Sequence, residues 1–473
     1  MPMKSALAEA AAAVQAATEK ASNDPSRPVY HFRPPAQWMN DPNGTIFHDG
    51  WYHLFYQHNP YGDSWGSSHW GHARSRDMIH WEHLPIALAP SRELGEKHCY
   101  SGCAAINDSA TPLLLYTSIG DRDPEQWAAI GDADLITWRK HPDNPLLTIR
   151  AHGDLDISQW RDPFVFSHDE RTFMLVGGKL SSRNGGEAAC LIYEAQDPRL
   201  LSWTYRGVFY RHPNRDYPHF ECPNICRLGD SWVLLGAFEL STIEYAVGTV
   251  DWNTLSFEAH TRGTVDRGRK DDSAFYATNL LTTPDQRVVL FGWVKGFKEG
   301  MGWSGCQSLP RELSLDDEGA LVQQPAREVE SLRCMHAELG TFTVESASRV
   351  LDNIGGDCIE LLLRVDVSAA EAFTLELRRS PEGRSSAPIR YANGALDIHG
   401  MKVDVPRTAR TGKLDLRVFL DKSVMEVFVN GGRACCTRIV YKREYDRQIA
   451  CTAEGGRVVV ESMDFWQMQP VFD

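Results

Sequence analysis

The chain has 473 residues, which is too long for one ordinary hydrophobic core and therefore predicts two domains. With 42% hydrophobic and 24% charged residues, its composition is typical of a soluble globular protein. The formal net charge of −14 argues against a nucleic acid or an anionic membrane as partner, because phosphate groups recruit positively charged surfaces.

Residues 1–28 are expected to form an N-terminal helical extension. The segment is rich in alanine, and Glu9, Glu19 and Lys20 are scattered through it. It has no continuous apolar stretch of the kind found in a secretory signal, so an amphipathic helix is the preferred interpretation. No apolar run anywhere in the chain is long enough to span a bilayer.

Five short apolar and aromatic segments, expected to be strands, start roughly 60 residues apart, a period that indicates stacked units. They are 52–56, 113–116, 173–176, 232–235 and 288–291. A second echo follows, in which Trp81, Trp138, Trp203 and Phe257 each close a unit after a turn. Residues 29–328 are therefore predicted to form a five-bladed β-propeller. The alternative is chance spacing of core strands in another all-β fold.

The pattern changes from about residue 329. Segments 358–365 and 414–420 alternate between apolar and polar residues, as half-buried strands do. Glycine-rich turns are expected at 353–356 and 430–432. Residues 329–473 are therefore predicted to form a β-sandwich. The predicted fold is all-β: a short N-terminal helix, a five-bladed propeller and a C-terminal sandwich.

The eleven cysteines fall at irregular spacings and include the adjacent pair Cys435 and Cys436. No Cys-x-x-Cys or histidine-containing metal pattern is present, so no structural zinc is expected. An odd number of cysteines without a framework favours reduced thiols, and hence a cytoplasmic location.

The segment 38–44, Trp-Met-Asn-Asp-Pro-Asn-Gly, places one carboxylate in a constrained turn. Pro42 fixes its own φ and biases Asp41 toward an extended conformation, and Gly44 permits a φ that other residues resist. A carboxylate held this rigidly suits attack on a sugar carbon. The alternative is an ordinary surface turn, because these residue types are common in turns.

Two further acids also lie beside prolines and apolar residues. Asp162 follows Arg161, whereas Glu221 precedes Cys222 and has no basic residue next to it in sequence. Desolvation raises a carboxyl pKa and a neighbouring arginine lowers it. The hypothesis is a glutamic acid that stays protonated near neutral pH and an aspartate that stays ionised, as a glycosidase requires. The alternative for each is a weak surface ion pair.

Together these segments resemble glycoside hydrolase family 32, which comprises invertases, sucrose-6-phosphate hydrolases and fructanases. The matching positions are 38–44, 55–60, 65, 70–73, 100–102, 161–163, 221–223, 275–277, 303–305, 309–313 and 421–430. The chain has Tyr100 for the usual Phe, Cys103 for Ser, and Asn224 where plant relatives often have Asp. These departures concern substrate preference and not the reaction class.

The resemblance implies release of terminal β-D-fructofuranosyl units with retention of configuration. Asp41 would be the nucleophile, Glu221 the acid/base and Asp162 a transition-state stabiliser. A retaining enzyme is expected to have its two reacting carboxyls about 5–5.5 Å apart. Two carboxylates and water suffice, so no metal or organic cofactor is expected. Asp421 and Glu426 lie in a polar hairpin of a domain that the resemblance makes non-catalytic.

Further residues are expected to surround the acids. Asn40 and Gln57 would hydrogen-bond the fructose ring or the nucleophile, and tryptophans would exclude water. Cys222 is interpreted as a packing residue, since no histidine partner is evident. For the aromatic residues, the alternative is a place in the propeller core. The expected substrate-binding residues are Trp38, Asn40, Gln57, Trp65, Tyr100, Ser101, Arg161, Cys222, Tyr276 and Trp303.

Three rival functions stay open: a fructosyltransferase using the same residues, a five-bladed glycosidase acting on arabinose or xylose polymers, and a non-catalytic carbohydrate-binding propeller. The expected partner is a small sugar, sucrose or a fructo-oligosaccharide, rather than a nucleic acid or a membrane. Sucrose, sucrose 6-phosphate, raffinose and short fructans share the fructosyl end, and the sequence does not select among them. A sandwich edge or exposed face could support a homodimer.

Overall fold

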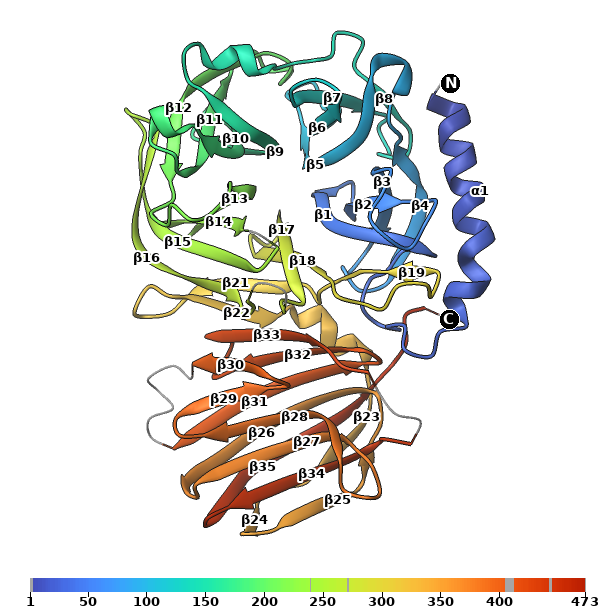
Figure 1. Cartoon of the computed structure of the whole chain (residues 1–473), viewed down its shortest axis with the longest axis vertical. Coiled ribbons are helices and arrows are strands. Elements are labelled where there is room, and N and C mark those ends of the chain that lie inside the picture. Colours follow the sequence, from blue (N-terminus) through green and yellow to red (C-terminus); the bar gives the residue numbers. More distant parts are fainter. Residues whose placement is uncertain (1–2, 239, 270–271, 405–411, 442–444, 473) are drawn as a thin grey trace.

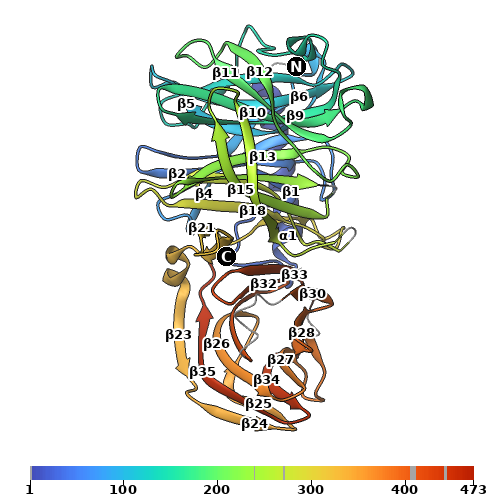
Figure 2. The ribbon, with the colours of Figure 1, turned by 90° about the vertical axis from the view of Figure 1, so that its left-hand side faces the viewer.

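The computed structural model describes residues 3–238, 240–269, 272–404, 412–441 and 445–472. The chain folds into one N-terminal helix, α1 (Met3–Ser22), a ring of five sheets, and a second domain of two sheets (Figure 1). The two domains are stacked along the long axis of the molecule (Figure 2). This arrangement confirms the predicted helix, five-bladed propeller and sandwich. In the described part of the chain, no helix is long and apolar enough to cross a membrane.

The five sheets are propeller blades, and their first strands contact one another in a ring around the centre (Figure 1). The first three blades are β1 (Gln37–His48), β2 (Trp51–Asn59), β3 (His69–Ser75) and β4 (Trp81–Leu88); β5 (Glu96–Ile106), β6 (Pro112–Gly120), β7 (Glu125–Gly131) and β8 (Trp138–Lys140); and β9 (Ile157–His168), β10 (Arg171–Leu180), β11 (Ala188–Ala195) and β12 (Trp203–Arg211). The last two are β13 (Glu221–Leu228), β14 (Ser231–Phe238), β15 (Thr242–Asp251) and β16 (Ser256–Asp266); and β17 (Phe275–Thr282), β18 (Val288–Val294), β20 (Cys306–Gln307), β21 (Arg311–Leu315) and β22 (Leu321–Pro325).

The five strand segments predicted from the 60-residue period are the second strands of the blades, β2, β6, β10, β14 and β18. The aromatic echo also has a structural cause. The indole N–H groups of Trp81, Trp138 and Trp203 donate to the carbonyl three residues earlier, at 2.9, 2.9 and 3.0 Å. Each of these carbonyls belongs to a buried residue with positive φ, so the indole caps a left-handed turn.

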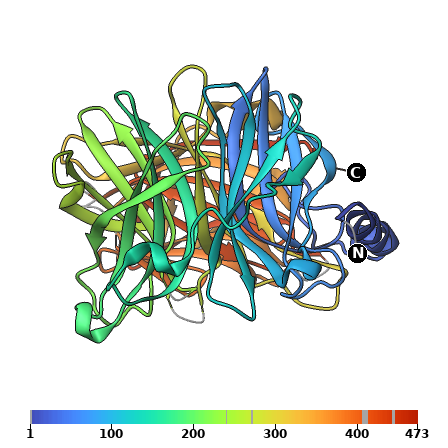
Figure 3. The same cartoon turned by 90° about the horizontal axis from the view of Figure 1, so that it is seen from above.

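The ring closes where β19 (Trp303–Ser304) pairs in parallel with β1. Trp303 is buried there, and its indole N–H donates to a carboxylate oxygen of Asp24 at 2.8 Å. Helix α1 lies outside the ring (Figure 3), and its Val14 and Ala21 pack in the same apolar cluster as Trp303. Trp303 therefore joins the helix and the last blade to the first blade.

The second domain is a sandwich of two sheets with one apolar core between them (Figure 2). One sheet contains β23 (Arg333–Glu338), β24 (Phe342–Glu345), β26 (Cys358–Ala369), β31 (Lys413–Asp421), β32 (Val424–Val429), β33 (Ala434–Ile439) and β35 (Arg457–Met468). The other contains β25 (Ser348–Gly355), β27 (Ala372–Arg379), β28 (Ser385–Ala392), β29 (Ala395–Ile398), β30 (Met401–Asp404) and β34 (Gln448–Glu454). The turn expected at 353–356 is largely an irregular end of β25, with a register shift after Val350.

Carboxylates of the sandwich bind the propeller at the interface between the domains. Asp421 accepts hydrogen bonds from the backbone N–H groups of residues 29–31, each at 2.8 Å. Glu426 accepts the Leu309 N–H at 2.8 Å and lies 2.5 Å from Nη2 of Arg311. The ring of His31 bridges the two carboxylates, 2.9 Å from each. The polar hairpin predicted here, β31–β32, is thus an attachment point between domains.

Candidate active site

The three acids singled out in the sequence come from the first strands of three blades and meet in one pocket. The pocket has a volume of about 350 Å³, and Asp41 on β1, Asp162 on β9 and Glu221 on β13 all line it. The pocket is also lined by Trp38, Asn40, Gln57, Trp65, Tyr100, Arg161, Cys222, Leu240, Tyr276 and Trp293. Residues far apart in the chain, such as Asp41 and Cys222, which are separated by 181 positions, are in contact here.

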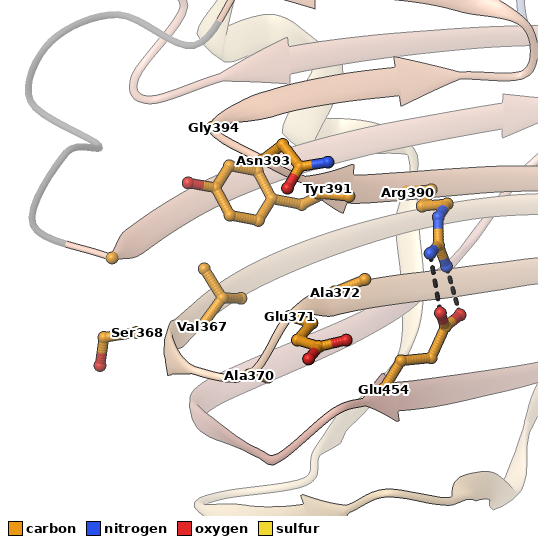
Figure 4. Close-up of a pocket in the computed structure, with 12 residues that line it drawn as sticks. Val367, Ser368, Ala370, Glu371, Ala372, Arg390, Tyr391, Asn393, Gly394 and Glu454 are labelled. Atoms are coloured by element: carbon orange, nitrogen blue, oxygen red, sulfur yellow. Dashed lines mark hydrogen bonds and ion pairs between the residues drawn. The ribbon is translucent and has the colours of Figure 1, made fainter.

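A larger groove of about 700 Å³ lies in the sandwich (Figure 4). Of its two carboxylates, Glu371 and Glu454, the second is engaged by Arg390, with Nη2 2.8 Å from Oε2. It lacks the group of carboxylates from different sheets that the propeller pocket has. The propeller pocket is therefore the candidate active site.

Asp41 lies in a bulged strand and not in the separate turn expected from the sequence. Pairing of β1 with β2 shifts register between Met39 and Pro42 and again between Asn43 and Ile46. Such bulges re-aim side chains and accommodate a proline that cannot donate to the ladder. Gly44 is required because its φ is +52° and a Cβ there would lie 2.8 Å from the Phe55 ring.

Polar side chains hold both oxygens of Asp41. Asn40 donates to Oδ1 at 3.1 Å, and its own oxygen accepts the Trp38 indole N–H at 2.8 Å. Ser101 donates to Oδ2 at 2.6 Å, and Gln57 reaches the same oxygen at 3.3 Å. Burial raises the pKa of Asp41, and the hydrogen bonds from Ser101 and Asn40 partly offset the effect. Ser101 thus contacts the acid from behind, without lining the pocket.

Asp162 is buried beside Asp41 and Glu221. Its Oδ2 accepts the Cys222 backbone N–H at 2.9 Å, and its own N–H donates to Thr117 at 2.9 Å. Burial raises the pKa of Asp162 to about 6, against the opposing effect of the Arg161 charge. This carboxylate is ionised at neutral pH but close to its titration range.

Arg161 has a closer charge partner than Asp162, the partner expected from the sequence. Its Nη2 lies 2.5 Å from Oε1 of Glu221, and its Nε forms a longer ion pair with Asp162, at 3.9 Å. Both side chains line the pocket, because Asp162 has a φ of +66° and departs from the regular alternation of a strand. His219 lies 3.2 Å from the same Glu221 oxygen, and Tyr276 donates to the other.

The expectation that Glu221 is protonated near neutral pH is therefore wrong for this structure. Burial would raise the pKa of Glu221, but hydrogen bonding by His219 and the Arg161 charge lower it to about 2. Glu221 is therefore a carboxylate near neutral pH, and it must gain a proton before it can act as an acid.

Cys222 places its Sγ 3.6 Å from Oδ2 of both Asp41 and Asp162. Burial raises the pKa of this thiol well above its ordinary value, and the nearby carboxylates act in the same direction. A neutral thiol is a poor nucleophile. Cys222 therefore packs between the two acids. No group of three or more metal-ligating side chains occurs among the residues that the structure describes.

One expected wall residue is displaced and others were missed by the sequence analysis. Trp303 does not line the pocket, because it is buried at the ring closure. Trp293 on β18 takes a place in the wall, and Leu240, 54% exposed, lies at the pocket as well. His219 was also missed, although its position two residues before Glu221 would have placed both side chains on one face of an extended segment.

Comparisons with known proteins agree with this geometry. Residues 31–325 match the model of the glycosyl hydrolases family 32 N-terminal domain, and residues 328–467 match that of the family 32 C-terminal domain. A sucrose-6-phosphate hydrolase of Escherichia coli is 30% identical, and the alignment covers 93% of this chain and 94% of the relative. A raffinose invertase of Escherichia coli is 29% identical, with 93% and 95% covered.

Solved structures show the same fold. The sucrose-6-phosphate hydrolase of Lactobacillus gasseri superposes with a TM-score of 0.84 at 24% identity, over 98% of this chain and 97% of that one. Fructan 1-exohydrolase IIa of Cichorium intybus gives a TM-score of 0.84 at 24% identity, over 95% and 98%. Both family models, which together span nearly the whole chain, lead to one conclusion: this protein belongs to glycosyl hydrolase family 32.

Proposed function

We propose that the protein is a retaining β-fructofuranosidase that hydrolyses terminal fructosyl units of sucrose or related fructosides. The observation that carries the proposal is the meeting of Asp41, Asp162 and Glu221, from three blades, in one pocket with tryptophan walls. A pair of carboxylates is what glycoside hydrolysis requires. The relatives named above act on sucrose 6-phosphate, raffinose or fructans, which share a fructosyl unit.

In the first step, Asp41 attacks the anomeric carbon of the fructosyl unit while the bond from that carbon to the leaving oxygen breaks. Glu221 gives its proton to this oxygen. The hydrogen bonds from Ser101 and Asn40 orient the attacking carboxylate. In the second step, Glu221 takes a proton from water, the water oxygen bonds to the same carbon, and Asp41 leaves.

Glu221 would alternate between two states, and its low pKa favours the carboxylate that the second step needs. A bound fructoside would displace water from the carboxylate, and this desolvation favours the protonated form. Asp162, held by Cys222 and offset from Arg161, is placed to accept hydrogen bonds from fructose hydroxyls. Such bonds strengthen as positive charge develops on the sugar.

The test is release of glucose and fructose from sucrose by the purified protein, with Asp41→Ala as the blank. Equal release of both sugars that is abolished in the variant is expected. Excess glucose over fructose would indicate a fructosyltransferase instead. Sugar binding without turnover would favour a carbohydrate-binding propeller, and release from arabinosides would favour the glycosidase that acts on arabinose or xylose polymers. In methanol and water, retention predicts methyl β-D-fructofuranoside, which NMR identifies.

We also infer a cytoplasmic location and self-association as a homodimer, and neither a nucleic acid nor a membrane as partner. The cysteine usage and the negative charge support the first and last of these. Cell fractionation and analytical ultracentrifugation test location and oligomeric state. Assays with sucrose, sucrose 6-phosphate and short fructans side by side would identify the preferred leaving group.

A further inference from the structure

A histidine takes part in the charge network of the proposed acid/base. His219 lies two residues before Glu221, with its Nε2 3.2 Å from the carboxylate oxygen Oε1. The same Nε2 lies 2.7 Å from Nη2 of Arg161, which is itself 2.5 Å from that oxygen. The three side chains are only 12–17% exposed. One nitrogen, one guanidinium and one carboxylate oxygen therefore form a closed triangle.

The protons in this triangle can be arranged in two ways. A guanidinium has only donors, so its contact with Nε2 requires a neutral imidazole whose proton is on Nδ1. In that form Nε2 accepts from Arg161 and has no hydrogen for Glu221, so the pKa of that carboxyl is then lowered by Arg161 and Tyr276 without a hydrogen bond from His219. A protonated imidazole has a hydrogen on Nε2 that can be donated to Glu221, but it faces the guanidinium with like charge. The neutral ring therefore holds Arg161 in place, and the protonated ring competes with it.

We propose that His219 is a positioning residue for Glu221, holding Arg161 against the carboxylate when neutral and replacing it as donor when protonated. The inference rests on the proposed role of Glu221 as acid/base. The described titratable groups that form this network are Arg161 from β9, Glu221 from β13 and Tyr276 from β17.

The charge on His219 should change activity in a defined direction. An imidazolium beside Glu221 adds positive charge, which disfavours uptake of the proton that the first step needs. Protonation of His219 therefore lowers activity further than protonation of Asp41 and Asp162 alone.

Two substitutions separate the hydrogen bond from the charge. In His219→Gln the amide oxygen still accepts from Arg161 but cannot be protonated. We expect its neutral-pH kcat on sucrose to stay within about threefold of wild type, and the acid limb of its kcat/KM profile to move to lower pH. In His219→Leu the acceptor is lost, and we expect kcat to fall about tenfold at all pH values with KM little changed.

The matched control is His212→Gln. His212 also pairs with a glutamate, 3.1 Å from Oε2 of Glu244, but neither residue lines the pocket. Its pH profile should superpose on that of the wild type after normalisation. Circular dichroism at each pH identifies any variant that fails to fold. Superimposable acid limbs for wild type and His219→Gln, or an unchanged kcat in His219→Leu, would overturn the proposal.

A second measurement does not depend on turnover. NMR titration of ring-labelled histidine follows the His219 resonance, identified by its absence in His219→Gln. Because a carboxylate favours the imidazolium, the titration midpoint of His219 should fall in Glu221→Gln. An unchanged midpoint would contradict the coupling even if the protein failed to cleave sucrose. Failure to cleave sucrose with a shifted midpoint would instead count against the proposed function alone.

Discussion

The propeller pocket and the domain interface both contain buried carboxylates, an arginine and a histidine, but they hold their carboxylates differently. At the interface, Asp421 accepts three backbone N–H groups and contacts His31. Glu426 contacts Arg311, His31 and a backbone N–H. Although burial opposes it, this pairing lowers the pKa of Glu426 to about 2.

In the pocket Glu221 is paired in a similar way, but among the described residues its two aspartates have no charged partner closer than 3.9 Å. Arg161 is the one arginine or lysine in the described lining, and it faces three carboxylates. Burial raises the pKa of Asp41 and of Asp162, and repulsion from Glu221 adds to it. Saturated carboxylates stabilise the attachment of two domains, whereas under-paired ones can respond to a ligand. A buried carboxylate that has few partners in the protein is therefore the one able to interact with a ligand.

The largest effect should come from removing the pocket's nucleophile. Asp41→Asn keeps the shape of the side chain but removes its charge, so kcat on sucrose should fall about 10³–10⁵-fold. The thermal midpoint should stay equal or rise, because a buried and incompletely paired charge is lost. Steady-state kinetics and calorimetry measure the two effects. A strong loss of stability would mean that Asp41 stabilises the fold as the interface carboxylates do, which would contradict the difference between the two regions.

The interface should show the opposite pattern. Glu426→Ala leaves Arg311 and His31 without a shared partner, and breaking a buried ion pair typically costs about 3–5 kcal/mol. Denaturant unfolding should show this loss, while kcat measured well below the unfolding transition should change less than about twofold. A large fall in kcat in a folded Glu426→Ala protein would mean that the interface also positions the pocket.

The interface should also make stability depend on alkaline pH. The pKa of His31 is raised to about 9 because hydrogen bonds and charge from Asp421 and Glu426 outweigh burial. A raised histidine pKa contributes stability that is complete below the unfolded value near 6.5 and is lost as the pH rises through 9. The loss should be about 3 kcal/mol. Thermal unfolding should show it in the wild type and much less in His31→Gln.

Two tryptophans in the family-like motifs should respond differently to substitution, and the change at the pocket should be the smallest effect of all. Trp65 is 53% exposed at the pocket and stacks on His98, so Trp65→Ala should raise KM for sucrose a few-fold, about 1 kcal/mol, without lowering the thermal midpoint. Trp303 is 1% exposed at the ring closure, so Trp303→Ala should lower stability by about 3–5 kcal/mol with little change in KM. A raised KM with unchanged stability in Trp303→Ala would instead indicate that Trp303 lines the pocket.

Much of the fold could be predicted because its units repeat. The 60-residue period of apolar segments marked the second strand of every blade, and the closing tryptophans marked turns whose carbonyls they cap. Equivalent positions in a closed ring face one channel, which is why acids far apart in the chain could be expected in one pocket. These features are local, or repeat locally, and so are visible in the chain itself.

The sequence by itself therefore determined the β-rich repeat, the two domains, the family resemblance and the three acids. Only the tertiary structure decided which charge faces which. In the folded chain, Arg161 of one blade contacts Glu221 of the next, and His219 contacts both side chains. Trp303 is buried at the ring closure and does not line the pocket. The physical reason is that burial and Coulomb interactions depend on distance in space, and strand pleating and ring closure set those distances.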